Sequence, residues 1–226
     1  MTVQLSHFAS RTVIQETLFK DTEAPLSQKE TLPLCDGELL WIHGFLPADH
    51  CLRLFETLRT TLPWRQDHLT IAGRTIPVPR LQAWLGDAGT RYQYSGLTLE
   101  PEPWTRELAL LKSAIESASQ TRFNSVLANL YRDEKDSVSW HADNEPELGT
   151  NPVVASLSLG ATRTFQLKHQ RYRDRKHTLP LKDGDLLIMK GTLQHHWLHQ
   201  VPKNRHPCQP RINLTFRAID RNKSNE

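Results

Sequence analysis

Short apolar segments recur through the second half of the chain and are separated by turn-forming residues. These β-prone segments cover residues 123–131, 153–159, 162–168, 186–190, 195–201 and 211–219. Regular spacing of short strands is typical of antiparallel sheets packed as a sandwich or barrel, whereas parallel sheets alternate strands with helices. The pattern therefore predicts a pair of antiparallel sheets between residues 122 and 219.

The first half of the chain carries two amphipathic helical patterns. One begins after Pro47 and ends before Pro63, and the second covers residues 103–118. A short apolar strand is predicted at residues 39–42, and a strand, turn and return strand at residues 69–76. The Gly- and Tyr-rich residues 86–96 are predicted to form a loop.

The length of 226 residues suits a single domain. Residues 1–36 show no sustained period, and we predict that they form an N-terminal arm with little structure of its own. Residues 37–226 then form one domain, because no internal repeat or low-complexity linker divides them. The predicted class is α+β, with helices packed outside a C-terminal antiparallel double sheet.

Composition excludes several other classes of protein. Hydrophobic residues make up 38% and charged residues 23%, as in soluble globular proteins. No apolar run is long enough to span a bilayer, and no basic segment followed by an apolar run begins the chain, so we expect neither a membrane span nor a secretory signal. Cys35, Cys51 and Cys208 are odd in number and widely spaced, which predicts free thiols.

His141 and Asp143 lie two residues apart in a segment that we expect to be extended. Residues at that spacing share one face of a strand, about 6–7 Å apart. Together with a second His, they can form the 2-His-1-carboxylate set that binds Fe(II) in non-haem oxygenases. The alternative is a His and an Asp that hydrogen-bond locally at a strand end, and this short motif leaves both interpretations open.

The last predicted strand alternates strictly between apolar and polar residues. Its polar face carries Arg211, Asn213, Thr215 and Arg217. This face either belongs to an edge strand and is solvated, or it binds a dicarboxylate, because a guanidinium matches a carboxylate in shape. The two Arg lie about 20 Å apart along a fully extended strand. A dicarboxylate would therefore require the strand to twist and the two side chains to converge.

Taken together, these motifs resemble the AlkB family of Fe(II)/2-oxoglutarate dioxygenases, in particular its homologues 2 and 3. The resemblance covers residues 69–219 and includes further matches at residues 87–89 and 94–98. It rests mainly on Asn129-Leu130-Tyr131, His141-Ala142-Asp143, a His in residues 196–199, and Arg211-x-Asn213-x-Thr215-x-Arg217. It implies a double-stranded β-helix (jelly-roll) core, which agrees with the predicted strands.

The resemblance also implies roles for individual residues. The second metal His of the family lies twelve positions before the first Arg of the last strand, which selects His199 over His195 and His196. The metal ligands implied are then His141, Asp143 and His199. The residues implied to bind 2-oxoglutarate are Asn129, Tyr131, Arg211, Asn213, Thr215 and Arg217. Arg211 would pair with the distal carboxylate, and Arg217 would lie near the carboxylate that chelates iron.

An N-alkylated base is cationic, so its site requires an aromatic face and a carboxylate for the exocyclic amino group. Tyr94 and Glu145 supply these groups, and Tyr92 is a further candidate for the same cavity. The alternatives are a packed ring for Tyr94 and an exposed loop acid for Glu145. Basic residues are concentrated in residues 163–177, which we expect in a hairpin, and in the loop 203–206. Both segments are interpreted as surfaces that contact phosphates.

The predicted function is oxidative repair of N-alkylated bases, of the 1-methyladenine and 3-methylcytosine type, in DNA, with RNA as a further candidate substrate. It uses Fe(II), 2-oxoglutarate and O₂ and releases succinate, CO₂ and formaldehyde. The alternatives are a dioxygenase for a protein or another substrate, and an inactive nucleic-acid-binding module. We expect a monomer without a membrane partner, cytoplasmic in a bacterium and nuclear in a eukaryote. Ala72 stands where the duplex-repairing homologue has a bulky apolar residue, which predicts a preference for single strands.

Overall fold

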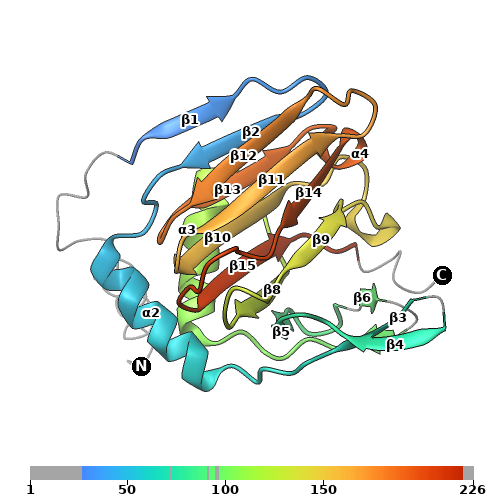
Figure 1. Ribbon diagram of the computed structural model, residues 1–226. Coiled ribbons are helices and arrows are strands. Elements are labelled where there is room, and N and C mark those ends of the chain that lie inside the picture. The colour runs from blue at the N-terminus through green and yellow to red at the C-terminus, as the bar shows by residue number, and fades with distance from the viewer. Residues whose placement is uncertain (1–26, 72, 91, 95–96, 221–226) are drawn as a thin grey trace, which may run out of the picture.

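Two antiparallel sheets face each other in the computed structural model, which describes residues 27–220 except 72, 91, 95 and 96 (Figure 1). The larger sheet has seven strands, in the order β1 (Lys29–Leu32), β2 (Glu38–Ile42), β13 (Leu186–Lys190), β10 (Val154–Gly160), β15 (Arg211–Arg217), β8 (Ser125–Tyr131) and β5 (Leu81–Gly86). The smaller sheet has four, in the order β12 (Lys176–Leu181), β11 (Arg163–His169), β14 (Trp197–Val201) and β9 (Val138–His141). The predicted double sheet is confirmed.

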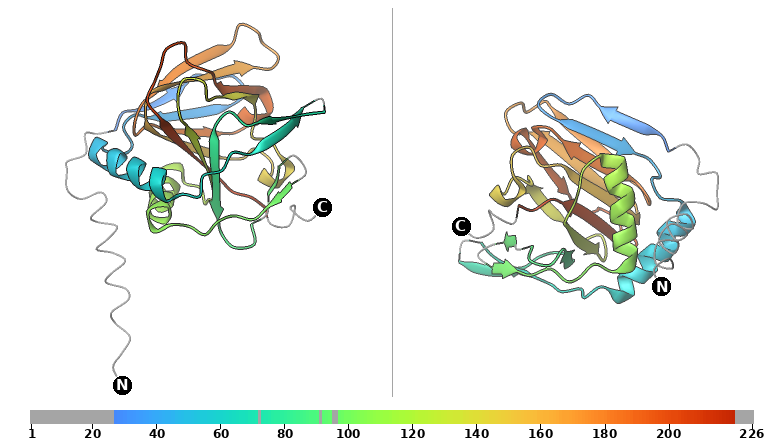
Figure 2. Two further views of the ribbon diagram at one scale, coloured as in Figure 1. Left: turned by 60° about the horizontal axis from the view of Figure 1, so that its bottom comes forward. Right: turned by 180° about the vertical axis from the view of Figure 1, so that it is seen from behind.

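Helices cover the outer face of the larger sheet. The two long helices are α2 (Ala48–Thr61) and α3 (Arg106–Ser119), and Figure 2 shows them on the same side of that sheet. Their apolar residues form one buried core with the sheet residues that face them, including Leu58, Ile115 and Leu214. Both helix predictions are confirmed, although α3 begins at Arg106. It begins there because the Thr105 side chain accepts a hydrogen bond from the Leu108 amide (3.3 Å) and caps the helix.

Strand β15 lies in the interior of the larger sheet, between β10 and β8. Its apolar residues Ile212, Leu214 and Phe216 pack in the core beneath the helices. The alternate residues face the smaller sheet, and Arg211 on this face is only 1% exposed. The edge-strand interpretation of this polar face is therefore wrong, and its side chains project into the space between the sheets.

Several local predictions need correction. Strand β1 falls within the predicted arm, because pairing with β2 holds a segment that is mostly exposed and has little hydrophobicity of its own. Strand β6 (Tyr92–Tyr94) lies within the predicted loop and pairs with β7 (Leu97–Leu99). The segment at 195–201 begins with a short helix, α4 (Leu193–His196), so its strand starts at Trp197. The boundary at residue 36 between arm and domain stays a prediction.

The remaining elements are small. The predicted strand and return strand form the hairpin of β3 (His68–Ile71) and β4 (Arg74–Pro77), and a 3-10 turn, η1, covers Pro146–Leu148. Strands β5 and β12 were not predicted. In β12, only Leu179 and Leu181 are buried, so its position depends on pairing with β11. Among the described residues, no helix is long and apolar enough to cross a membrane.

The two cysteines Cys35 and Cys51 are expected to differ sharply in reactivity. Cys35 is exposed, whereas Cys51 lies on the buried face of α2 and is 0% exposed. Burial, reinforced by the nearby carboxylate of Asp183, raises the pKa of the Cys51 thiol to about 12. A thiol reagent at mildly alkaline pH should therefore modify Cys35 and leave Cys51 intact until the protein is unfolded. Peptide mapping by mass spectrometry measures this, and early labelling of Cys51 in folded protein would contradict it.

Candidate metal centre

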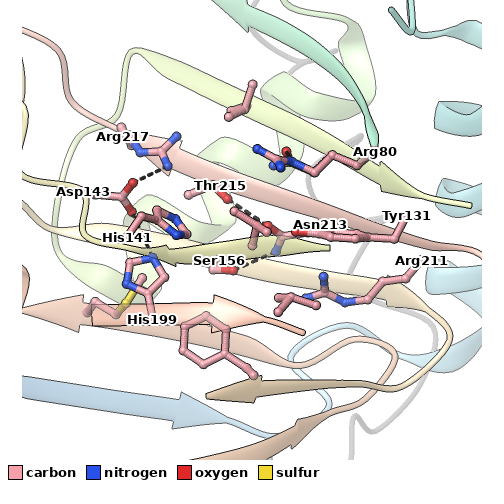
Figure 3. A pocket seen from close by; sticks show the side chains of 16 residues that line it. Arg80, Tyr131, His141, Asp143, Ser156, His199, Arg211, Asn213, Thr215 and Arg217 are labelled. Carbon is pink, nitrogen blue, oxygen red and sulfur yellow. Dashed lines mark hydrogen bonds and ion pairs between the residues drawn. The ribbon is translucent and has the colours of Figure 1, made fainter. Parts of the chain in front are cut away.

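Strands β9 and β14 bring together the three side chains that the sequence proposed as metal ligands. His199 on β14 is the register partner of His141 on β9, and Asp143 follows just after β9 ends. The imidazole centroids of His141 and His199 lie 4.2 Å apart, and His199 Nε2 lies 3.8 Å from Asp143 Oδ2. One possible donor atom from each residue lies within 4.8 Å of the other two. Figure 3 shows them converging at one end of a pocket.

The electrostatics of this cluster hold Asp143 and His199 in their metal-binding forms. Burial alone would raise the pKa of the Asp143 carboxyl, but Arg217, His199 and His141 outweigh that effect and hold the pKa at about 2. Burial and the neighbouring His141 lower the pKa of His199 to about 3. Asp143 is therefore a carboxylate at neutral pH, and His199 is a neutral imidazole with a lone pair for a metal.

The donor set fits a divalent transition metal such as Fe(II). Arg217 Nη2 donates to Asp143 Oδ1 at 2.7 Å, so this oxygen is already engaged. The other oxygen, Oδ2, is buried and has no hydrogen-bond partner among the described residues. Two imidazoles and one carboxylate oxygen on one side of a cavity match the 2-His-1-carboxylate arrangement, which leaves coordination positions open for a co-substrate and oxygen.

Arg211 lies in the same pocket and is suited to bind a carboxylate. Its Nη2 donates to Ser158 Oγ at 2.9 Å, but Nε and Nη1 are buried and find no hydrogen-bond partner among the described residues. Burial lowers the pKa of Arg211 to about 10, so the guanidinium is still charged at neutral pH. A buried cation with two unused donors is costly unless a ligand supplies an anion.

Asn129 and Tyr131 come from β8, whose register places them opposite Asn213 and Arg211. The Asn129 side-chain oxygen accepts hydrogen bonds from Arg80 Nε at 2.7 Å and Gln82 Nε2 at 3.1 Å. This orients the amide and directs its NH₂ group for donation elsewhere. The guanidinium carbon of Arg211 lies 5.3 Å from the centroid of the Tyr131 ring. All of these side chains except Gln82 line the cavity.

Asn213 and Thr215 also line the cavity, but their polar groups are largely engaged with neighbouring protein groups. Asn213 Nδ2 donates to Ser156 Oγ at 2.8 Å, and its side-chain oxygen accepts from Thr215 Oγ1 at 2.9 Å (Figure 3). Arg211 and Arg217 occupy opposite ends of this wall and line one cavity. The two arginines thus share one pocket despite their separation along the strand, as a dicarboxylate site requires.

Sequence reasoning missed the residues that orient those it found. Arg80, which precedes β5, donates to Asn129. Ser156 and Ser158 lie on β10 and accept hydrogen bonds from Asn213 and Arg211 on the neighbouring strand β15. The serines left a signal, since they interrupt the otherwise apolar segment at residues 153–159 at alternate positions. Arg80 left none, because its role depends on the pairing of β5 with β8.

The residues predicted to hold the base are less well defined. Glu145 is half-buried at the start of η1 and is not among the described residues that line the cavity. The side chains of Tyr92 and Tyr94, and the whole of Ala72, lie outside the described residues. Their predicted roles therefore stay predictions.

A second group of possible metal ligands, formed by Cys35, Asp36 and His169, does not fit a metal. His169 Nδ1 accepts hydrogen bonds from the amides of Arg171 and Tyr172, both at 3.1 Å. The imidazole proton must then be on Nε2, which faces Asp36 Oδ2 at 3.2 Å. No lone pair is left on Nε2, and the cluster is interpreted as a structural hydrogen-bond network.

The basic segments occupy two separate positions. Arg163 is 1% exposed and donates to the carbonyls of Asp133, Asp136 and Pro202, so its predicted contact with phosphates is wrong. The exposed cations of the β11–β12 hairpin are Arg171, Arg173, Arg175 and Lys176. The Gln170 amide in this turn donates a hydrogen bond to the carbonyl of His196 in α4. Because α4 also contacts Asp143 through Gln194, the turn lies at the end of the sheets that holds the proposed metal ligands. The loop 203–206 leads from β14 to β15 at the opposite end.

Comparison with known sequences leads to the same family as the resemblance of the motifs. The family described as the 2OG-Fe(II) oxygenase superfamily matches residues 38–217. Alpha-ketoglutarate-dependent dioxygenase alkB homolog 3 of Mus musculus is 46% identical over 186 residues, which cover 78% of this chain and 64% of that protein. The chain thus spans less than two thirds of the length of this relative. DNA oxidative demethylase ALKBH2 of Mus musculus is 35% identical over 192 residues, covering 82% of this chain and 80% of that protein.

Solved structures agree at the level of the fold. The structure of OsALKBH1 superposes with a TM-score of 0.58 at 18% identity and covers 84% of this chain and 100% of that chain. A prolyl hydroxylase from Trichoplax adhaerens superposes with a TM-score of 0.53 at 14% identity, covering 82% and 85% of the two chains. The predicted jelly-roll core is thereby confirmed. The chain belongs to the 2OG-Fe(II) oxygenase superfamily and, within it, to the group that contains AlkB homologues 2 and 3.

Proposed function

We propose that the protein is an Fe(II)- and 2-oxoglutarate-dependent dioxygenase that removes alkyl groups from the nitrogen atoms of nucleic-acid bases. The observation that carries the proposal is one cavity that holds His141, Asp143 and His199 together with the charged, incompletely bonded Arg211. A metal and a dicarboxylate both match this arrangement. The choice of a nucleic acid as substrate is supported by relatives named as DNA oxidative demethylases.

In this proposal His141, Asp143 and His199 hold the iron. With 2-oxoglutarate and O₂, bound iron would supply the oxidising power for hydroxylation of the N-alkyl carbon, with succinate and CO₂ as co-products. A hydroxylated N-methyl group would then leave as formaldehyde, which restores the unmodified base. Arg211 pairs with the distal carboxylate of 2-oxoglutarate through its two unused donors. Asn129 and Tyr131 donate hydrogen bonds to 2-oxoglutarate from β8, the neighbouring strand in the same sheet.

Arg217 has a double role in this arrangement. Its Nη2 holds Asp143 Oδ1 at 2.7 Å, so that Oδ2 is directed toward His199. Its positive charge also helps to keep the carboxylate ionised, and it lies where the metal-chelating carboxylate of 2-oxoglutarate would bind. Asn213 and Thr215 stiffen the wall between the two arginines through their mutual hydrogen bond. Burial of Arg211, Asn213 and Thr215 excludes bulk water from this part of the cavity.

Tyr94 and Glu145 are proposed to receive the base, Tyr94 through its ring and Glu145 through a hydrogen bond from the exocyclic amino group. The preference for single strands stays a prediction that depends on Ala72. We propose that the protein acts as a monomer, and this function implies a nuclear location in a eukaryote and a cytoplasmic one in a bacterium.

The decisive experiment is mass spectrometry of oligonucleotides with one 1-methyladenine or 3-methylcytosine, incubated with protein, Fe(II), 2-oxoglutarate and O₂. Loss of one methyl group with equimolar succinate is expected, and none should occur with His141→Ala. Succinate release that stays independent of any methylated oligonucleotide, DNA or RNA, would point to another substrate. No iron-dependent succinate release under any condition would indicate an inactive binding module.

The β11–β12 hairpin is proposed to contact the phosphates of the substrate, because its four exposed cations lie at the metal end of the sheets. Replacing Arg171, Arg173 and Arg175 together with Gln should weaken oligonucleotide binding and flatten the dependence of log affinity on log salt. Three lost contacts to a single strand should reduce that slope by about 2. Fluorescence anisotropy over a range of salt concentrations measures it.

A matched control replaces three exposed arginines on the helix-covered side, Arg53, Arg59 and Arg122, with Gln. This variant loses the same net charge but should retain the slope of the unchanged protein. If the salt-dependence slope falls equally in both variants, only overall charge matters, and the hairpin is an ordinary solvated turn without phosphate contacts.

A further inference from the structure

Asp143 lies at a point where the sheet no longer holds the backbone. Strand β9 is at the end of the smaller sheet, and its ladder with β14 stops at the His141–His199 pair. The Asp143 amide therefore has no partner from a neighbouring strand, although a metal ligand needs a well-fixed backbone. Instead, the amide donates to Oε1 of Gln194 at 2.9 Å. Gln194 is 0% exposed and comes from helix α4, 51 residues further along the chain.

The orientation of the Gln194 amide follows from its second contact. Its Nε2 lies 3.6 Å from Met189 Sδ, which carries no hydrogen and can only accept. The NH₂ group therefore faces the sulfur, and the oxygen faces the Asp143 amide. A flipped side chain would place two donors against each other at Asp143 and two acceptors against each other at Met189. Both contacts thus favour the same rotamer.

Helix α4 gives this side chain a rigid base. Leu193 is fully buried and packs so closely against Gly37 that a Cβ atom there would lie 2.9 Å from the Leu193 Cα. Trp197, directly after α4, is also fully buried, and its Nε1 donates to the Cys35 carbonyl at 2.8 Å. Strand β14 continues from Trp197 to His199. The segment that holds Gln194 is therefore the same segment that presents a proposed metal ligand.

We propose that Gln194 is a positioning residue of the metal centre, which fixes Asp143 relative to His199 through the Asp143 amide. The inference rests on the proposed role of Asp143 as a metal ligand. It assigns Gln194 no contact with the metal, the co-substrate or the base. Its effect should therefore appear first in metal affinity and in the geometry of the bound metal, because outer-shell partners typically change metal affinity about 10- to 100-fold when they are removed.

The test titrates metal-free protein with Co(II) and follows affinity by calorimetry and geometry by the visible absorption spectrum. Gln194→Met keeps the length of the side chain but removes the oxygen acceptor, and should weaken Co(II) binding about 10- to 100-fold and change the spectrum. Burial should keep the side chain of Gln194→Glu protonated, so that its carbonyl oxygen accepts from the Asp143 amide while its hydroxyl donates toward Met189 Sδ, and this variant should stay close to the unchanged protein. His195→Ala, on the exposed side of the same helix, is the matched control and should have no effect.

Each outcome decides a separate point. Unchanged affinity and spectrum in Gln194→Met would overturn the inference, as would equal losses in Gln194→Met and Gln194→Glu, which would indicate packing instead of the acceptor oxygen. Thermal unfolding of the metal-free variants shows whether they are folded, and Gln194→Leu replaces Gln194→Met if the latter is not. Asp143→Ala is titrated in parallel. If it binds Co(II) as well as the unchanged protein, the proposed metal site itself fails, whatever the result at position 194.

Discussion

The His199→Ala variant is expected to lose turnover entirely and to bind Co(II) or Fe(II) far more weakly than the unchanged protein. His199 supplies one of three proposed protein ligands, and its low pKa of about 3 keeps its lone pair available at neutral pH. Removal of an outer-shell partner already costs about 10- to 100-fold in metal affinity, so loss of a ligand itself should cost more. Succinate release and calorimetric Co(II) titration measure the two effects.

The neighbouring histidines provide matched controls. His195 is exposed on α4, and the His196 ring stacks on His169 at a centroid distance of 5.9 Å, away from the proposed ligands. His195→Ala and His196→Ala should therefore retain most of the activity and the metal affinity. A His199→Ala protein that turns over normally, with an inactive His195→Ala protein, would show that the distal ligand has been assigned to the wrong residue.

The Arg211→Lys variant should require far more 2-oxoglutarate while binding metal normally. Lysine retains the charge but lacks the planar pair of donors that matches a carboxylate. The loss of one hydrogen bond to a charged group, about 1.5–3 kcal/mol, corresponds to an increase of about 10- to 100-fold in the concentration needed. Arg211 is fully buried, so water cannot replace the missing donor.

The measurement is the KM for 2-oxoglutarate in succinate release, together with Co(II) affinity as a check that the metal centre is intact. Arg205→Lys, in the exposed loop before β15, controls for the exchange of one cation for another and should leave the KM unchanged. An unchanged KM in Arg211→Lys would rule out Arg211 as the partner of the distal carboxylate.

Alternation along single strands determined much of the site without any tertiary information. Strict period-two patterning placed Arg211, Asn213, Thr215 and Arg217 on one face, and the structure shows all four lining one cavity. The spacing of His141 and Asp143 was informative for the same reason. Short strands separated by turns also predicted the double sheet, because the hydrophobic pattern of a strand is a local property.

Only the tertiary structure decided what each face meets. Whether the polar side of β15 met water or a second sheet depended on the position of β15 between β10 and β8, and no pattern within the strand itself encodes its neighbours. The short elements also depended on tertiary contacts. Strand β1 is held by its pairing with β2, and α4 interrupts a segment whose local sequence predicts a strand.

The residues that orient the site are the clearest case of tertiary control. Gln194 reaches Asp143 across 51 residues of chain, and Arg80 reaches Asn129 across 49. A polar residue of this kind has an ordinary local sequence, because its role depends on one hydrogen bond to a distant partner and not on a periodic pattern. The sequence alone therefore determined which side chains carry the proposed chemistry. The packing of the two sheets and of α4 determined how those side chains are held.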